Sequence, residues 1–299
     1  MLSSILLSLT VAAMQEAAVP FPPELQFEPV TLEQGLLGHT PQLSTGLDGA
    51  THLIWMSGTE QPGENRIHHR VYRDKEWSEA QVLAQGKGWF VNWADFPQFQ
   101  EDGDGGAVVS WLAHPQTGHG YGTMFRKRRE SGAAWTMPQV LHADRKAAEH
   151  GFVSLVPLGQ GRFFANWLQS EESGRPTHLR GGVMGPSGEI KAETVLDPMV
   201  CDCCGTDSIV LPSGNVVVAY RDRSEEEVRD IHVVRGKPED PSSWSKPTKI
   251  GHEDWITASC PVNGPVLAHD GSFVALAYFS GHLPIGSSLH LATSKGGGK

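Results

Sequence analysis

Five aromatic residues recur along this chain at almost constant intervals. They are Trp55, Trp111, Trp167, Tyr220 and Tyr278, and 56, 56, 53 and 58 residues separate them. Each lies in a similar apolar run, from THLIWMSG at 51–58 to SFVALAYFS at 272–280. A period of this length is typical of stacked copies of one supersecondary unit. The repeat therefore constrains the fold before any local pattern is considered.

One copy, residues 97–141, predicts four strands joined by turns. PQFQE alternates, DGDGG turns, AVVSWLAH is apolar, YGTMFRKRR alternates again, and WTMPQVL ends the unit. Fourth strands are expected to begin at Trp77, Trp135, Ile190 and Trp244, a second rhythm in phase with the first. Four antiparallel strands in about 55 residues are typical of a β-propeller blade. A β-sandwich is the alternative, but it does not explain two matched periods.

The N-terminus has the features of an export signal. Residues 5–13 are an apolar run that ends in Val11-Ala12-Ala13, which resembles a signal-peptide core and cleavage site. No Lys or Arg precedes the run, although signal peptides usually carry one there. The alternatives are a wrongly assigned translation start or a disordered N-terminal tail. We therefore expect a signal peptide over 1–20, a single propeller domain over 21–299, and a periplasmic or extracellular protein. The run is too short to span a membrane, and no other segment approaches that length.

The overall charge excludes some partners. The net charge of −10 disfavours binding to nucleic acid or to an anionic membrane surface. We expect a monomer whose partner is a small ligand.

Several motifs resemble the sialidase superfamily, also called BNR-repeat proteins. Degenerate forms of the turn motif S-x-D-x-G-x-x-W/F occur as ESGAAW and PEDPSSW, and SKGGGK at the C-terminus matches its beginning. NWADFP (92–97), CDCC (201–204), YRDRSEEEVRDI (220–231) and CPVNGP (260–265) are similar to a bacterial exported subgroup described as exo-α-sialidase-like. The resemblance covers 35–299 and implies a six-bladed, all-β, sialidase-type propeller. Four full blades and three strands of a fifth are present, so we expect the chain to be truncated after Lys299.

Superposition of the repeats on their aromatic residues predicts a ring of side chains at one end of the central channel. The equivalent positions, 16 to 18 residues before each aromatic, are His39, Asp95, His150, Cys204 and Cys260. Inner strands surround the channel of a propeller, so we expect these residues around its mouth, with Cys201 and Cys203 beside them. Every residue type in this ring can bind a metal ion.

The four cysteines leave two interpretations open. All of them fall in equivalent loops of adjacent blades. One interpretation is a disulfide between Cys260 and a cysteine of the CDCC motif, as an oxidising compartment favours. The other is a copper or zinc site formed by Cys201, Cys203, Cys204, Cys260 and the ring histidines His39 and His150.

The loop after Tyr220 is the most charged segment, and it should lie at the same channel mouth. Solvated ion pairs are one interpretation. The sialidase resemblance implies another, in which arginines bind a substrate carboxylate and carboxyl groups supply acid–base catalysis. The candidate catalytic residues are Asp95, Arg221, Asp222, Glu225, Arg229 and Asp230.

Two features depart from the catalytic sialidase pattern. GHTPQL at 38–43 has His39 where sialidases commonly carry an arginine of their Arg triad. The family's nucleophilic tyrosine would fall beyond Lys299.

Three tryptophans of the loops that enter the first strands, Trp89, Trp93 and Trp255, can stack against a sugar or pack between blades. We therefore expect an exported, sialidase-like protein that acts on or binds carboxylated glycans. A copper- or zinc-binding propeller and a non-catalytic interaction scaffold are the alternatives.

Overall fold

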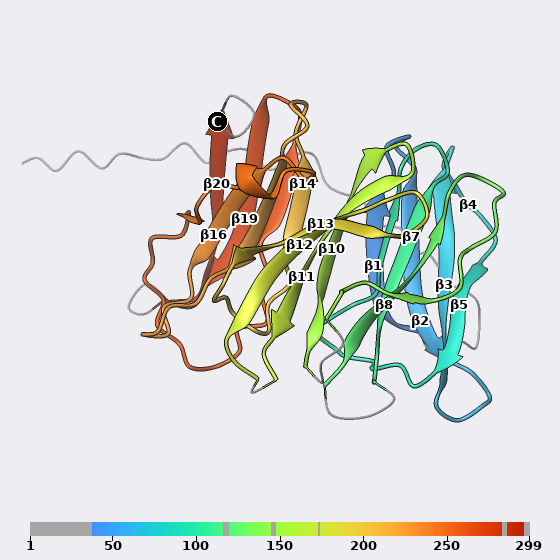
Figure 1. Ribbon diagram of the computed structural model, residues 1–299, viewed down its shortest axis with the longest axis horizontal. Helices are drawn as coiled ribbons and strands as arrows, with labels where there is room; N and C mark the ends of the chain where they lie inside the picture. Colours follow the sequence, from blue (N-terminus) through green and yellow to red (C-terminus); the bar gives the residue numbers. More distant parts are fainter. Residues whose placement is uncertain (1–37, 116–119, 145–147, 173, 283–285, 296–299) are drawn as a thin grey trace, which may run out of the picture. The chain divides into compact units, whose positions relative to one another are not determined.

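The fold is described by a computed structural model, which covers residues 38–115, 120–144, 148–172, 174–282 and 286–295. All of these residues belong to one compact unit, 37–299. The expected signal peptide, 1–20, and residues 296–299 of the expected turn motif lie outside the described residues. Figure 1 shows this unit as a succession of antiparallel sheets.

Five sheets follow one another along the chain. In the last four sheets, consecutive strands pair antiparallel. In the first sheet β1, β2, β3 and β4 pair in order, and β5 pairs with β3 as well. The first sheet contains β1 (Gly38–Thr45), β2 (Thr51–Gly58), β3 (Glu64–Arg73), β4 (Glu76–Trp77) and β5 (Gln81–Lys87). The second contains β6 (Gln98–Glu101), β7 (Ala107–Ala113), β8 (Gly122–Arg128) and β9 (Gln139–Val140), and the third contains β10 (His150–Gly159), β11 (Arg162–Ser170), β12 (Thr177–Met184) and β13 (Ile190–Asp197). The fourth contains β14 (Asp207–Val210), β15 (Val216–Arg221), β16 (Ile231–Gly236) and β17 (Thr248–Lys249), and the last contains β18 (Val266–His269), β19 (Phe273–Ser280) and β20 (Ser288–Lys295).

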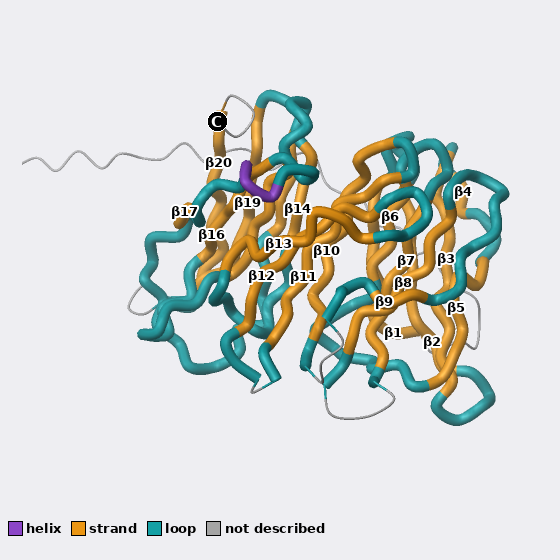
Figure 2. The backbone as a smooth tube through the Cα atoms, in the orientation of Figure 1, coloured by secondary structure: helices purple, strands orange, loops and turns teal. Residues whose placement is uncertain are grey.

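This arrangement confirms the predicted all-β propeller, with four complete blades and three strands of a fifth. Two of the predicted fourth strands begin later than expected. β9 and β17 start four residues after Trp135 and Trp244, directly after Pro138 and Pro247. Proline has no backbone N–H to give to a ladder, so it marks the start of the strand. The one helix among the described residues is the short 3-10 turn Pro241–Ser243, which Asp240 caps (Figure 2).

The five periodic aromatic residues occupy equivalent places in the second strands. Trp55, Trp111, Trp167, Tyr220 and Tyr278 lie in β2, β7, β11, β15 and β19, and all are buried. In three blades, the aromatic residue faces a histidine of the third strand, as in the pair of Trp55 and His68, whose rings stack with centroids 5.0 Å apart. The regular spacing of the aromatic residues therefore identifies one equivalent core position in each blade.

The core lies between neighbouring sheets. One cluster packs Ile54 and Met56 of the first sheet against Phe99 and Val109 of the second. Three further clusters join the second sheet to the third, the third to the fourth, and the fourth to the fifth. Burial of these side chains is the main force that holds each blade against the next.

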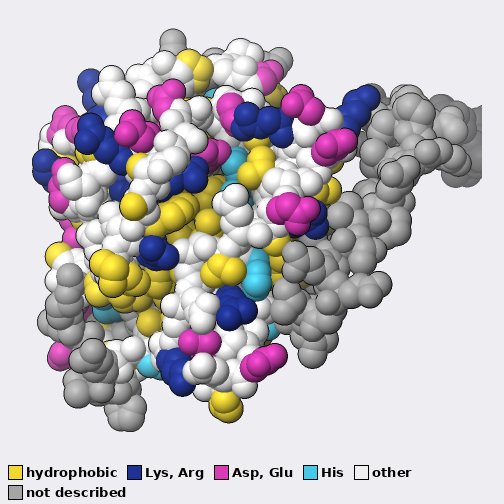
Figure 3. Space-filling view, turned by 90° about the vertical axis from the view of Figure 1, so that its right-hand side faces the viewer, with side chains coloured by type: hydrophobic (Ala, Val, Ile, Leu, Met, Phe, Trp, Pro, Cys, Tyr) yellow, Lys and Arg dark blue, Asp and Glu magenta, His cyan; other side chains and the backbone are white. Residues whose placement is uncertain are grey.

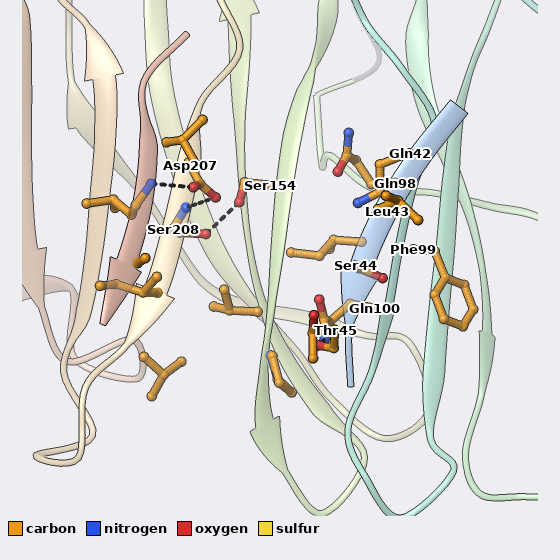
Figure 4. A pocket seen from close by; sticks show the side chains of 18 of the residues that line it. Gln42, Leu43, Ser44, Thr45, Gln98, Phe99, Gln100, Ser154, Asp207 and Ser208 are labelled. Atoms are coloured by element: carbon orange, nitrogen blue, oxygen red, sulfur yellow. Dashed lines mark hydrogen bonds between the residues drawn. The ribbon is translucent and has the colours of Figure 1, made fainter. Parts of the chain in front are cut away.

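The first strands of all five sheets, β1, β6, β10, β14 and β18, line one cavity of about 860 Å³. Neighbouring first strands are in contact along this cavity. Figure 4 shows polar side chains pointing into it, among them Gln42, Gln98 and Ser154. Ser154 Oγ and Ser208 Oγ lie 2.7 Å apart and join β10 to β14. The cavity is therefore the central channel that the repeat predicts.

The outer side of the first blade exposes both apolar and charged groups. Figure 3 looks onto the side that carries β3, β4 and β5, and hydrophobic side chains gather in its middle with charged ones around them. Tyr72 of β3 and Val82 of β5 are among the exposed apolar residues. Within the described ranges, no helix has the length and hydropathy of a membrane span.

Candidate functional site at the ring face

The ring face is the end of the propeller formed by the loops that enter the first strands and the loops that join second strands to third. His39 and His150 lie at the start of β1 and β10. Asp95, Cys204 and Cys260 lie in the loops that lead into β6, β14 and β18. The superposition of repeats thus brings the five residues to the same end of five neighbouring strands.

Asp95 is enclosed between the second and third blades. Its Oδ2 accepts a hydrogen bond of 2.7 Å from the backbone N–H of Phe152. Gly151 allows this approach, because a Cβ at that position would lie 2.1 Å from Asp95 Oδ2. Burial raises the pKa of Asp95 to about 7, with the Phe152 N–H acting in the opposite sense. A good fraction of the Asp95 carboxyl is therefore protonated at neutral pH.

Tyr121, in the loop that leads into β8, lies near three carboxyl groups. Burial raises its pKa, and the charges of Asp95, Glu149 and Asp202 raise it further. The phenol is therefore neutral and available as a hydrogen-bond donor. Glu149 is exposed, and partial desolvation together with the charge of Asp202 raises its pKa as well. Tyr121 thus marks the point at which loops from three blades converge.

The cysteines of the CDCC motif form a compact cluster. Cys201 Sγ lies 3.7 Å from Cys203 Sγ and 3.6 Å from Cys204 Sγ. Cys201 and Cys204 are buried, whereas Cys260 is exposed, and all four cysteines are free thiols. Hydrogen bonding with the Cys203 and Cys204 thiols lowers the pKa of Cys201, and the charge of Arg229 contributes in the same sense. The cluster therefore favours a thiolate at Cys201.

Arg221 was expected to bind a substrate carboxylate, but its guanidinium is buried and directed at the backbone. It donates to the carbonyls of Arg229 at 2.7 Å, Asn263 at 3.0 Å and Phe279 at 2.8 Å. Its guanidinium carbon also lies 5.1 Å from the ring centroid of Trp255. These contacts hold the fourth and fifth blades together and leave Arg221 unsuited to receive a ligand.

Arg229 is also buried, and it connects the charged loop to the cysteines. Its Nη1 donates to Cys201 Sγ at 3.2 Å, and its Nη2 donates to Glu227 at 2.8 Å. Arg223 also pairs with Glu227. Arg175, from the loop between β11 and β12, lies 3.4 Å from Asp202 and has a side chain that is 56% exposed. Of these arginines, Arg175 offers the most accessible guanidinium.

The acidic residues of the charged loop differ in their environment. Asp230 is buried and accepts hydrogen bonds from the backbone N–H groups of Asp254 and Trp255 and from Lys249, so it supports the loop. Burial raises the pKa of Asp222 to about 6, although His232, 3.5 Å away, lowers it. Glu225 is exposed, in contrast to the buried Asp230. Asp222 is thus the loop carboxyl whose protonation is poised near neutral pH.

The three tryptophans divide into packed and exposed positions. Trp89 packs on Trp111 with ring centroids 5.2 Å apart, and Trp255 packs on Arg221 and Phe279. The side chain of Trp93 is 78% exposed. Trp93 is therefore the tryptophan best placed to stack on a ligand.

The ring histidines do not join the cysteines. His150 is buried and stacks on His142 with centroids 3.6 Å apart, and burial lowers its pKa. His39 lies within 3.5 Å of the Thr40 hydroxyl. In the part of the chain that the structure describes, neither histidine belongs to a group of three metal-ligand atoms within 4.8 Å of one another.

Sequence reasoning missed Tyr121, Glu149, Arg175 and Asp202. Asp202 stands inside the CDCC motif and could have been found there. The other three carry no periodic signal, because they lie in loops of unequal length, and only the fold brings them together.

Comparison with known proteins supports the fold and leaves the family open. No protein-family model matches the chain, and neither does any curated protein. Among solved structures, the chain is similar to an α-L-arabinanase of Penicillium chrysogenum in complex with arabinobiose. That similarity has 11% identity and a TM-score of 0.53, and it covers 86% of this chain and 76% of that one.

Two further structures share the architecture. An α-L-arabinofuranosidase of glycoside hydrolase family 93 from Fusarium graminearum has 13% identity and a TM-score of 0.53, with 86% of this chain and 77% of that chain covered. A polysaccharide lyase has 12% identity and a TM-score of 0.55, with 85% and 57% covered. At these identities, the similarity establishes the fold alone. The chain has the β-propeller fold of these carbohydrate-active enzymes.

Proposed function

We propose that this protein binds or processes a carboxylated glycan at the ring face. The observation that carries the proposal is the convergence of Tyr121, whose backbone bridges to Glu149, with Asp95 and Asp202, whose charges help to raise the pKa of its phenol. A neutral phenol, carboxyl groups of raised pKa and guanidinium groups next to them are the functions that recognise and protonate a sugar acid. The likeness in fold to an arabinanase, an arabinofuranosidase and a polysaccharide lyase is consistent with a glycan ligand.

Acid catalysis is favoured by a carboxyl group whose pKa is raised above its ordinary value and which reaches the ligand. Glu149 has a raised pKa and is exposed, so it is our candidate for the proton donor. Asp222, with a pKa of about 6, is a second candidate. Asp95 is enclosed, and we assign it the positioning of the loops around Tyr121.

Recognition of a carboxylate requires an accessible cation. Arg175 projects from the loop between β11 and β12 beside Asp202 and Glu227. A ligand carboxylate can replace these partners at the exposed guanidinium, because surface ion pairs are weak. Trp93 supplies an exposed aromatic face for the sugar ring.

The test is a comparison of ligands and of two arginine variants. Sialosides, uronides and neutral arabinosides are titrated against the protein by calorimetry, and their hydrolysis or elimination is followed by chromatography. We expect binding of a carboxylated glycan that Arg175→Ala weakens at least about tenfold, the loss of one charge-assisted contact. The matched control is Arg162→Ala, a partly exposed arginine that also pairs with a glutamate, Glu239, and should leave binding unchanged.

Equal binding of a carboxylated glycan and its methyl ester would contradict the carboxylate specificity. Binding without turnover of any ligand would favour the hypothesis of a non-catalytic interaction scaffold. The metal-binding alternative rests on the cysteines of the CDCC motif and on Cys260.

A further inference from the structure

The CDCC motif folds into a turn that gathers three sulfur atoms from four consecutive residues. The turn follows Val200, which bridges to Asp222, and the backbone N–H of Cys201 donates to the carbonyl of Arg221 at 3.0 Å. This anchoring leaves the side chains of Cys201, Cys203 and Cys204 on the same side. Their ligand atoms all lie within 4.8 Å of one another.

The spacing of the sulfur atoms suits a shared metal ion. Thiolates that bind one zinc ion at about 2.3 Å with tetrahedral angles lie about 3.8 Å apart. The observed separations from Cys201 Sγ are 3.7 Å to Cys203 and 3.6 Å to Cys204. A disulfide requires about 2.0 Å between two sulfur atoms and leaves the third without a role.

A fourth donor comes from the neighbouring blade. Cys260, in the loop that leads into β18, places its sulfur within 4.8 Å of a carboxylate oxygen of Asp202 and of Cys203 Sγ. Cys260 is exposed, so its side chain has room to turn toward the cluster.

Two buried guanidinium groups lie beside the cysteine cluster. Arg229 is fully buried and donates to Cys201 Sγ at 3.2 Å. Arg221, also buried, lies close enough for its charge to act on Cys204. Three thiolates around one cation leave a net negative charge, and two buried guanidinium groups offset it. N–H to sulfur hydrogen bonds of this kind commonly support metal–thiolate centres.

We propose that Cys201, Cys203 and Cys204 bind one thiophilic d10 ion, zinc(II) or copper(I), with Cys260 as a fourth ligand from the next blade. Soft thiolate ligands select these two ions over hard cations such as magnesium or calcium. The site excludes His39 and His150, which the sequence had grouped with the cysteines. Its cysteine ligands are not residues assigned to the glycan, whereas Asp202 lies next to both sites. The bound ion would fasten the fourth blade to the fifth.

The experiment uses the full chain, reduced and purified without oxygen, and titrates it separately with zinc(II) and copper(I). Metal content is measured by mass spectrometry, and the ligand shell is measured by X-ray absorption. We expect one ion per chain, retained against a chromophoric chelator, with three or four sulfur atoms at about 2.3 Å. The two titrations decide which ion is held more tightly.

Two single variants locate the site. Cys203→Ser should weaken metal binding at least about tenfold, because the serine hydroxyl is a poor ligand for these ions. Cys260→Ser should reduce the number of sulfur neighbours by one and have a smaller effect. Both variants keep the Cys201 contact with Arg229, and circular dichroism establishes that each is folded before metal is added.

Two results would overturn the proposal. One is a folded, fully reduced protein that retains no stoichiometric ion of either kind. The other is a native disulfide between any two of Cys201, Cys203 and Cys204, detected by peptide mapping of the protein isolated without reduction.

Discussion

The guanidinium of Arg221 donates a hydrogen bond of 2.8 Å to the carbonyl of Phe279, from β15 in the fourth sheet to β19 in the fifth. The same guanidinium reaches the carbonyl of Asn263, in the loop before β18. Buried carbonyl groups need donors, and here one arginine satisfies several of them at once. A residue that looked like a ligand-binding arginine in the sequence is thus a connection between blades.

Replacement of Arg221 should therefore reduce stability before it affects any ligand. We expect Arg221→Ala to lower the free energy of unfolding by at least about 3 kcal/mol, because several buried carbonyls lose their donor. Urea unfolding followed by tryptophan fluorescence measures the change. Arg175→Ala is the control, since its exposed ion pairs contribute about 1 kcal/mol or less. Equal stabilities of the two variants would refute the role assigned to Arg221.

Asp95 should make the stability depend on pH in the opposite way to most carboxyl groups. Its pKa is about 7 in the folded protein, raised by burial, against an ordinary value of 3.8. The Asp95 carboxyl therefore loses its proton near pH 4 in the unfolded chain but only near pH 7 in the folded chain. The contribution of Asp95 to the free energy of unfolding is full below pH 3.8 and is lost as the pH rises to 7. A difference of about three pH units corresponds to about 4 kcal/mol.

The variant Asp95→Asn removes this pH dependence while its amide oxygen still accepts from Phe152. We expect the variant to be more stable than the parent protein at pH 8, with the advantage disappearing toward pH 4. Urea unfolding across this pH range measures both proteins. Asp270→Asn is the control, because hydrogen bonds from the Ser272 backbone and hydroxyl lower the pKa of this exposed carboxyl, and the substitution should bring no gain at pH 8.

The periodic part of the architecture was predictable because each blade repeats the same buried position. Trp55 and Tyr278 are 223 residues apart in sequence yet have the same place in their sheets. The site was predictable only in outline. Position along the chain places Asp95 and Cys204 at one end of the propeller. It does not reveal that Asp95 is enclosed or that the guanidinium of Arg221 donates its hydrogen bonds to backbone carbonyls. Those facts depend on side-chain direction and on loops such as the one carrying Tyr121, whose lengths differ from blade to blade.

A histidine pair at the opposite end of the first blade should destabilise the protein in acid. His52 Nδ1 lies 3.0 Å from His69 Nε2, and His52 Nε2 lies 2.9 Å from Glu101, which also pairs with Arg128. Burial lowers the pKa of His69 to about 4, and the charge of His52 adds to this effect, against an ordinary value of 6.5. The unfolded chain takes up this proton below pH 6.5 and the folded chain only near pH 4.

Stability should therefore be full above pH 6.5 and fall by about 3 kcal/mol between pH 6.5 and 4 from His69 alone. The free energy of unfolding is measured across this pH range for the parent protein and for His69→Gln. The difference between the two pH profiles is the contribution of His69. NMR titration of the His69 ring gives a direct check, since the ring should remain neutral at pH 5. A midpoint near 6.5 would show that the imidazole is not desolvated.

Trp93 and Trp89 lie four residues apart in the same loop, and their replacement by alanine should affect different properties: Trp89 the stability and Trp93 the binding of a glycan. Trp89 packs on Trp111, so Trp89→Ala should cost about 2 to 4 kcal/mol of unfolding free energy through lost packing. Trp93 is largely exposed, so Trp93→Ala should change stability by less than about 0.5 kcal/mol. If Trp93 stacks on the sugar, the same variant should weaken glycan binding several-fold, and calorimetry on both variants separates the two effects. Unchanged glycan affinity in a stable Trp93→Ala protein would remove Trp93 from the ligand site and leave recognition to Arg175 and the carboxyl groups around Tyr121.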